Sequence, residues 1–269
     1  MVHRSARVPA AVLTGALIAF GPVAAADVTM APAAAEVLTV DRSLHLTGAP
    51  NARDLGGYRT VDGRTVRTGI AFRTDQLTNL TPTDLTELTR RGVRTVDDLR
   101  TVYERALGPD RIPAGARAHW YDMIGAAPLP ELVSTLAGGS DLYRAFITAP
   151  GANQALAGVL RDIAASGRGP DAGAVLFHCT AGKDRTGWTA AVLLTLLGVD
   201  RTTVTEDYLL SNHYRGAAAG DPVGGVQREW LDAAFDQVAV SYGGFDRYVS
   251  EGLGLSSAEV DALKQRMLD

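Results

Sequence analysis

Short apolar runs alternate along the chain with stretches of helical periodicity. Residues 174–178 form such an apolar run, which is typical of a strand buried on both faces of a parallel sheet. Residues 93–99 and 118–121 predict two further strands. Within residues 53–73 the sequence predicts two strands joined at residues 61–64, because the Asp-Gly pair there favours a hairpin turn.

Helices are predicted between and after these strands. Thr81, Pro82 and Asp84 supply an N-cap, a first-turn proline and a first-turn acid, which together indicate a helix start. Strands that alternate with helices predict one α/β domain with a helical C-terminal portion. Further helices are expected at 152–165, at 186–197 and over most of 201–269.

The N-terminal segment has the three parts of a secretory signal peptide. Arg4 and Arg7 form a basic region without acids, residues 10–23 are apolar, and three alanines follow before Asp27. This pattern predicts a signal peptide over residues 1–26 with cleavage near its end. The apolar part is short for a membrane-spanning helix, although an uncleaved membrane anchor is the alternative interpretation.

Residues 27–37 are expected to be a flexible leader, and residues 38–269 to form the folded domain. No cysteine stands at the cleavage site to carry a lipid, so no stable membrane anchor is expected. The predicted location is therefore secreted or extracytoplasmic.

Composition narrows the class of protein. The chain has 269 residues, 46% hydrophobic and 21% charged, which is globular composition. A net charge of -4 argues against a nucleic-acid partner. With one cysteine the chain forms no intrachain disulfide and no multi-cysteine metal site. The histidines show no metal-ligand spacing, so neither a metal nor another cofactor is expected; they are His3, His45, His119, His178 and His213.

The densest chemistry lies in residues 178–187, between a predicted buried strand and a predicted helix. A strand–loop–helix turn directs successive backbone N–H groups into one concavity at the positive end of the helix, which suits a phosphate dianion. Cys179 begins the loop, and its sulfur is expected to face that centre as a thiolate nucleophile. Arg185 opens the helix and can hold two phosphate oxygens. Gly182 allows the turn and a close approach of phosphate.

The other loop residues have less specific roles. Thr180 and Ala181 are expected to offer backbone N–H groups to the phosphate, and His178 to orient the loop rather than act as a base. The Thr186 hydroxyl either caps the helix or hydrogen-bonds the thiolate, and Thr186 is expected to be one of the substrate-binding residues. Lys183 and Asp184 complete the loop, and both carry charged side chains.

The sequence from His178 to Gly187 resembles the bacterial tyrosine-phosphatase family whose loop reads His-Cys-x-x-Gly-Lys-Asp-Arg-Thr-Gly. Members of that family are often secreted and hydrolyse phosphotyrosine in proteins and phosphoinositides. The resemblance covers about residues 38–268, and it implies a protein-tyrosine-phosphatase-like α/β fold with a central, mostly parallel sheet flanked by helices. Further matching segments are 51–57, 72–75, 98–100 with Glu104, 207–212 and 242–248.

The resemblance implies hydrolysis of phosphomonoesters through a phosphocysteine on Cys179. The leaving oxygen needs a proton donor. Asp184 is the first candidate because it belongs to the family loop. Asp122 is the second, because relatives in the wider superfamily use an Asp on a loop after an earlier strand, but Asp122 lacks the usual neighbouring proline.

Lys183 bears on the substrate, because the chain has only one other lysine, Lys264. Tensin-type lipid phosphatases also carry a lysine at this position, so Lys183 is expected at the mouth of the loop, beside a second phosphate of an inositol ring. The expected partners are thus phosphotyrosine proteins, with phosphoinositides or phosphoserine/threonine as further substrates. The sequence does not indicate an oligomeric state.

Two other classes of protein fit parts of the pattern. A rhodanese-type sulfurtransferase also places a cysteine after a strand, but usually with four residues before the arginine, whereas five separate Cys179 from Arg185. A non-catalytic phosphate-binding module commonly loses the cysteine or the arginine, and here both are present.

Overall fold

A computed structural model of the chain describes residues 41–125, 139–167, 169 and 172–269. All of these residues belong to one structural unit. The predicted signal peptide and the predicted leader lie outside the described residues. Within the described ranges, no helix has both the length and the apolar character needed to cross a membrane.

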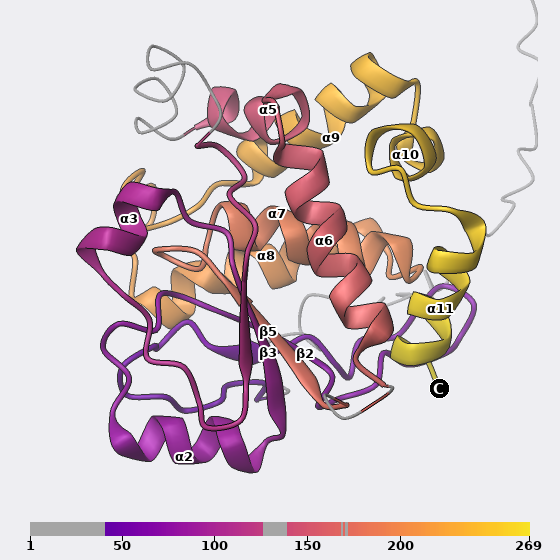
Figure 1. Cartoon of the computed structure of the whole chain (residues 1–269). Coiled ribbons are helices and arrows are strands. Elements are labelled where there is room, and N and C mark those ends of the chain that lie inside the picture. The colour runs from indigo at the N-terminus through magenta and orange to yellow at the C-terminus, as the bar shows by residue number, and fades with distance from the viewer. Residues whose placement is uncertain (1–40, 126–138, 168, 170–171) are drawn as a thin grey trace, which may run out of the picture. The chain divides into compact units, whose positions relative to one another are not determined.

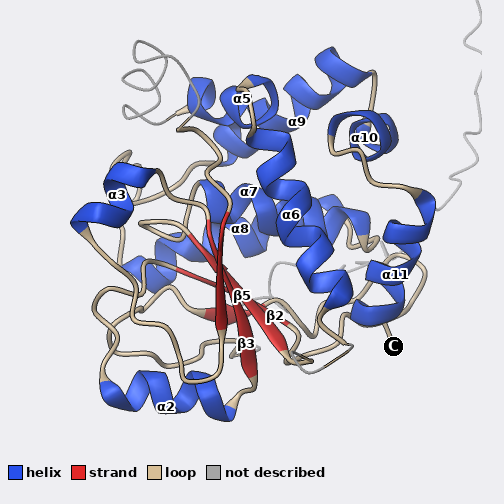
Figure 2. Ribbon diagram, in the orientation of Figure 1, coloured by secondary structure: helices blue, strands red, loops and turns tan. Residues whose placement is uncertain are grey.

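One five-stranded sheet lies at the centre of the described residues (Figure 2). Its strands are β1 (Arg53–Asp54), β2 (Ala71–Thr74), β3 (Val93–Asp98), β4 (Arg117–Trp120) and β5 (Ala174–His178). The order across the sheet is β1-β2-β5-β3-β4, and only the β1–β2 pair is antiparallel. The expected central, mostly parallel sheet is therefore confirmed.

Helices flank this sheet on both sides (Figure 1), with α2 on one side and α6 and α7 on the other. In chain order the helices are α2 (Pro82–Arg90), α3 (Val102–Leu107), α5 (Ser140–Thr148), α6 (Ala152–Ala165), α7 (Arg185–Leu196), α8 (Arg201–Arg215), α9 (Arg228–Tyr242), α10 (Phe245–Arg247), a π-helix (Tyr248–Gly252) and α11 (Ser257–Met267). The helical C-terminal portion is thus confirmed.

The central strand β5 contributes to two hydrophobic cores. Val175 and Phe177 pack into the larger core, with residues of α6 and α7, and Leu176 packs into the smaller one, with Leu88 of α2. Side chains alternate between the faces of a strand, so a strand covered on both faces is apolar at every position. All five residues of β5 are accordingly buried.

Most predicted elements agree with the structure. The strands expected at 93–99, 118–121 and 174–178 match β3, β4 and β5, and the helices expected at 152–165 and 186–197 match α6 and α7, each within one residue at either end. The Thr81 N-cap is also present as a capping box with Asp84.

The predicted hairpin is only partly right. The turn forms, because the Gly63 N–H donates to the Thr60 carbonyl (3.0 Å) and Gly63 has a φ of +90°. Isolated bridges rather than strands flank it: Thr65 pairs with Arg59, while Thr60 also pairs with Val199 far along the chain. Contacts with the end of α7 therefore replace an extended two-stranded ladder.

Candidate active site

The loop of residues 179–184 joins β5 to α7 at the carboxyl edge of the sheet. The parallel strands β2, β3, β4 and β5 all end at this edge, where open α/β sheets bind their ligands. Cys179 follows β5 directly and is 1% exposed. Arg185 is the first residue of α7, so the positive end of that helix also faces the loop.

The carbonyl groups of residues 180–182 all bond to groups outside the loop. The donors are the Gln76 N–H to Thr180 (3.2 Å), the Asn51 amide and the Arg215 guanidinium to Ala181 (3.1 and 3.0 Å), and the Arg73 guanidinium to Gly182 (3.0 Å). The N–H and C=O of one peptide unit point in opposite directions. The N–H groups of residues 181–183, which share these peptide units, therefore point inward, and they find no backbone acceptor among the described residues.

Gly182 is required by both conformation and space. Its φ is +66°, in the left-handed region that favours glycine. A Cβ at this position would lie 2.6 Å from the carbonyl oxygen of Thr74 at the end of β2. The loop can therefore pack this tightly against β2 only with glycine at position 182.

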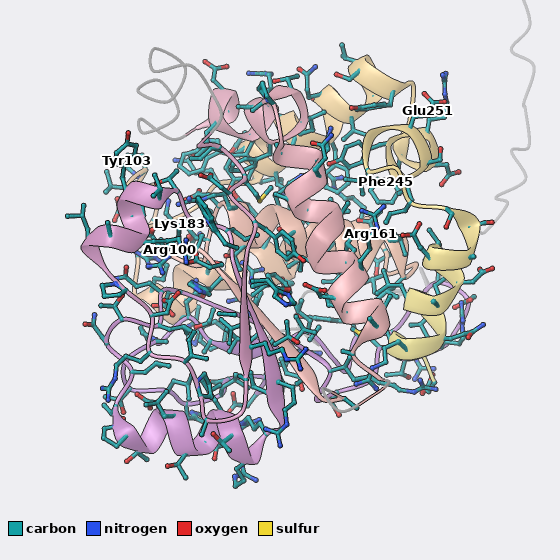
Figure 3. The ribbon with its side chains drawn as sticks, in the orientation of Figure 1. Arg100, Tyr103, Arg161, Lys183, Phe245 and Glu251 are labelled. Carbon is teal, nitrogen blue, oxygen red and sulfur yellow. The ribbon has the colours of Figure 1, made fainter. Side chains whose placement is uncertain are left out.

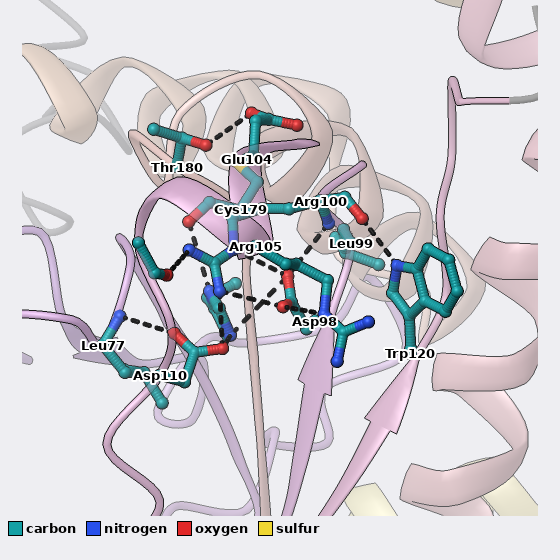
Figure 4. Close-up of polar contacts among 12 residues, drawn as sticks. Leu77, Asp98, Leu99, Arg100, Glu104, Arg105, Asp110, Trp120, Cys179 and Thr180 are labelled. Carbon is teal, nitrogen blue, oxygen red and sulfur yellow. Dashed lines mark hydrogen bonds and ion pairs between the residues drawn. The ribbon is translucent and has the colours of Figure 1, made fainter. Parts of the chain in front are cut away.

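Glu104 of α3 holds the guanidinium of Arg185 in a two-pronged ion pair. The Arg185 Nη1 and Nη2 atoms lie 2.7 and 2.6 Å from the two carboxylate oxygens. The Thr180 hydroxyl donates to the same carboxylate (Figure 4). Burial disfavours the charged form of Glu104, but Arg185 outweighs it and lowers the pKa of Glu104 to about 2.

A bound phosphate must therefore share the Arg185 guanidinium with Glu104 or displace the carboxylate from it. The sequence indicates no role for Glu104 beyond the family resemblance, yet its contact with Arg185 places it in the candidate site. A signal for its placement exists, because Thr101 and Glu104 form the capping box that begins α3. That box predicts the helix, but only the fold brings Glu104 to Arg185.

His178 lies in a buried polar cluster beneath the loop. Its Nδ1 is 3.2 Å from the Cys179 carbonyl oxygen, and its Nε2 is 3.2 Å from an Asp110 oxygen. Arg100 joins Asp110 to Asp98 through charge-assisted hydrogen bonds of 2.7 to 2.9 Å (Figure 4). This arrangement is that of a residue orienting the loop, as the sequence suggested.

A second buried cluster supports the loop from the side of β2. Arg53 and Arg73 both pair with the Asp207 carboxylate of α8, at 3.3 and 2.6 Å. All three side chains are almost fully buried. Although burial opposes it, the two arginines lower the pKa of Asp207. Because Arg73 also bonds the Gly182 carbonyl (3.0 Å), Asp207 positions the loop through Arg73.

Replacing Asp207 with Asn is expected to destabilise the fold strongly. The change leaves two guanidiniums buried without their counter-charge, which costs roughly 3–5 kcal/mol of unfolding free energy. Urea denaturation measures this loss. Asp232→Asn is the matched control, because Asp232 pairs with Arg201 on the surface (2.7 Å) and should change stability by less than about 1 kcal/mol. Similar values for both variants would contradict the role given to Asp207.

The structure places Lys183 differently from the expectation. Instead of standing open at the mouth of the loop, its ammonium is buried and donates to the Gly225 carbonyl (2.7 Å). It also lies 3.4 Å from an Asp184 oxygen and 5.5 Å from the centre of the Trp230 ring. The segment before α9 therefore covers this lysine.

The two candidate proton donors have different surroundings. Asp184 is held by Lys183 and by the Tyr143 hydroxyl, which donates to it at 3.1 Å. Asp122 follows β4 and accepts the N–H groups of Gly125 (2.6 Å) and Ile124 (3.1 Å). Burial raises the pKa of Asp122, and the charge of nearby Arg185 acts against this rise.

Backbone contacts bring the segment that contains Asp122 to the strand end that Arg185 reaches. The carbonyl oxygen of Leu99, at the end of β3, accepts from the N–H of Met123 (3.5 Å) and from Arg185 Nη1 (3.4 Å). The N–H of Tyr121, which immediately precedes Asp122, donates to the Asp98 carbonyl (2.8 Å). The segment after β4 is therefore fixed against the same strand end that the arginine reaches.

Neither role expected for Thr186 is seen. Its hydroxyl is buried without a hydrogen-bond partner among the described residues, Cys179 included. The helix N-cap is Asp184, whose side chain makes no capping bond. The contribution of Thr186 to phosphate binding stays a prediction.

A cysteine beneath inward-facing N–H groups, with an arginine at the start of the next helix, defines a phosphate-binding loop of the cysteine-dependent phosphatase class. Residues 44–269 match the model of the tyrosine phosphatase family. The chain belongs to that family.

Curated relatives agree with this assignment. A Cupriavidus necator protein assigned by name to the tyrosine-protein phosphatases is 31% identical over 87% of this chain and 92% of its own. The triple specificity protein phosphatase PtpB of Mycobacterium tuberculosis is 30% identical over 83% of this chain and 98% of its own. A tyrosine-protein phosphatase of Nostoc commune is 31% identical over 72% of this chain and 73% of its own.

Among solved structures, a crystal structure of P. aeruginosa TpbA in complex with phosphotyrosine is similar to this chain. The TM-score is 0.36 and the sequence identity 19%, over 75% of this chain and 88% of that one. A second TpbA crystal structure gives the same TM-score at 18% identity.

Proposed function

We propose that this phosphatase hydrolyses phosphotyrosine in proteins through a phosphocysteine formed on Cys179. The observation that carries the proposal is the outward bonding of the three loop carbonyls, because it leaves the N–H groups of residues 181–183 directed at the space above Cys179. These N–H groups and Arg185 would hold the three equatorial oxygens as charge spreads over them.

The reaction would take place in two displacements. The Cys179 sulfur attacks phosphorus in line, so that a sulfur–phosphorus bond forms while the phosphorus–oxygen bond to tyrosine breaks. The leaving oxygen takes a proton from a carboxylic acid. A water molecule then displaces the thiolate from phosphorus and releases inorganic phosphate.

Asp122 is supported as the proton donor over Asp184, which reverses the order that the sequence suggested. A donor must be protonated before it acts, and burial raises the pKa of Asp122. Asp122 also accepts two backbone N–H bonds, whereas Asp184 is engaged by an ammonium and a tyrosine hydroxyl. These two contacts favour a structural role for Asp184, which holds Lys183 and Tyr143 together.

Phosphoinositides are a second proposed class of substrate. Lys183 supports it, because this lysine belongs to the loop itself, although its ammonium must leave the Gly225 carbonyl to reach a second phosphate. A phosphotyrosine peptide carries a single phosphate, so it gains nothing from that lysine.

A substrate panel tests both classes with wild type and Lys183→Ala. Wild type should hydrolyse phosphotyrosine peptides, and the variant should lose roughly ten- to hundredfold in kcat/KM on phosphoinositides but less on peptides. Phosphoserine peptides complete the panel. Equal losses on both substrates would remove the phosphoinositide proposal, and no hydrolysis of phosphotyrosine by wild type would remove the first one.

The phosphatase is also proposed to act outside the cytoplasm. The basic, apolar and small-residue parts of residues 1–26 support this location. N-terminal sequencing of the protein from culture medium or cell envelope should show a chain that begins near Asp27. A chain that begins at Met1 in the cytoplasm would contradict export.

A further inference from the structure

A polar cluster outside the loop lies where β3, β4 and α6 meet. It contains Asp97 of β3, His119 of β4 and Asp162 of α6, and one donor atom from each lies within 4.8 Å of the others. His119 Nδ1 is 3.5 Å from an Asp97 oxygen and 2.7 Å from an Asp162 oxygen. The strand register explains the first contact, because Asp97 and His119 are direct partners in the β3–β4 pair.

Asp97 is the unusual member of this cluster. Its side chain is 0% exposed, and neither of its carboxylate oxygens accepts a hydrogen bond from the described residues. Burying a carboxylate without hydrogen bonds is costly, and buried charges normally pair with a cation or coordinate a metal. Burial accordingly raises the pKa of Asp97 to about 7.

Protonated His119 is the cation that faces both carboxylates, which raise its pKa to about 9, so a metal ion must take the place of that proton. The neighbouring arginine adds no second positive charge. Arg161 precedes Asp162 on α6, but its guanidinium bonds Glu259 (2.7 Å) and the Gly254 carbonyl (3.0 Å), towards the C-terminal helices (Figure 3).

A similar cluster on the other face of the sheet already holds its cation. Asp98, Asp110 and His178 also bring three donor atoms within 4.8 Å. There the guanidinium of Arg100 bonds both carboxylates. The cluster at Asp97 has two carboxylates and one imidazole, and no arginine of the described residues is bonded between them.

We propose that Asp97, His119 and Asp162 form a binding site for a divalent metal ion, with Zn²⁺ as the ion that fits best. Zn²⁺ takes imidazole nitrogen and carboxylate oxygen at about 2.0–2.2 Å, so its tetrahedral ligands lie roughly 3.3–3.6 Å apart. The 3.5 Å between Asp97 and His119 has this length. The 2.7 Å contact of Asp162 is a hydrogen bond that the ion replaces, and Asp162 has room to move because its side chain is 22% exposed.

The proposed metal site is open to solvent, and one of its carboxylates is oriented by a further hydrogen bond. The His119 side chain is 39% exposed, so the site opens to solvent on one side. The Tyr121 hydroxyl donates to the Asp162 carboxylate at 2.7 Å, as outer hydrogen bonds do around carboxylates that bind metals. A bound ion links β3, β4 and α6, and β4 leads directly into the segment that holds Asp122.

The experiment measures Zn²⁺ binding rather than activity, because Zn²⁺ also binds thiolates. Full-length, tag-free Cys179→Ser protein is treated with EDTA, dialysed and titrated with zinc chloride in a calorimeter. One ion should bind per chain, and a free concentration of about 100 times Kd should raise Tm by about 5 °C or more.

Variants assign the site. Asp97→Asn in the same background should abolish the Zn²⁺-dependent rise in Tm. Asp162→Asn, at a partly exposed position, should weaken binding as well. His45→Gln is the matched control, because His45 forms an exposed pair with Asp41 (3.0 Å), and it should bind Zn²⁺ as its parent does.

Two results overturn the proposal. The first is the absence of Zn²⁺ binding in the parent, which would mean that the cluster holds only protons. The second is binding that survives both Asp97→Asn and Asp162→Asn, which would place the ion elsewhere. Neither result bears on the phosphatase activity of the cysteine loop.

Discussion

Cys179→Ser is expected to lower kcat for aryl phosphates by at least about 10⁴-fold, since removing a nucleophile removes the covalent route altogether. A serine hydroxyl at this position meets the same N–H groups, but it ionises far less readily than a thiol. Steady-state turnover of p-nitrophenyl phosphate measures the loss.

The binding of phosphate should survive this change. The N–H groups of the loop and Arg185 remain in place, so inorganic phosphate or tungstate should bind Cys179→Ser about as tightly as wild type in a calorimetric titration. A variant that binds the anion but retains more than about a tenth of wild-type kcat would contradict a Cys179 nucleophile. Loss of both binding and turnover would point to a disturbed fold.

Asp122→Asn is expected to lower kcat by about 10²- to 10⁴-fold, which is the usual contribution of a positioned general acid. An amide has the size of the carboxyl group but no proton to give. The loss should depend on the leaving group, and it should be larger for phenyl phosphate than for p-nitrophenyl phosphate, whose leaving oxygen needs no proton.

The pH dependence adds a second readout. Because burial raises the pKa of Asp122, its protonated form persists to higher pH than that of an exposed aspartate. The fall of wild-type kcat on the alkaline side should therefore disappear in Asp122→Asn. Asp184→Asn is the comparison, and a larger, leaving-group-dependent loss there would return the proton donor to Asp184.

The loop is the part of the site that the sequence predicts best. A buried apolar strand followed by Cys179 and Gly182, with Arg185 at the helix start, requires only local geometry. Residues 174–178 and α7 therefore appear as expected. The family resemblance adds the flanking segments, whose arginines turn out to bind the loop carbonyl of Gly182 and the carboxylate of Asp207.

Contacts between distant elements are what the sequence could not show. The pairing of Glu104 with Arg185 depends on the position of α3 in the fold. The burial of Lys183 depends on the segment of Gly225, whose carbonyl, 42 residues away along the chain, accepts from its ammonium. The cluster of Asp97, His119 and Asp162 could not be predicted from the sequence for the same reason. Its members lie on two strands and a helix, so no ligand spacing appears along the chain.

The proposed mechanism requires Cys179 to carry the phosphoryl group during turnover. Excess wild-type enzyme is mixed with p-nitrophenyl phosphate, whose good leaving group speeds the first step, and is quenched at intervals through one turnover. Mass spectrometry of the digested enzyme should find phosphate on the peptide that contains Cys179, rising and then falling as inorganic phosphate appears. Phosphate on another residue would contradict this mechanism. So would an unmodified Cys179 at times when p-nitrophenol has been released but inorganic phosphate has not.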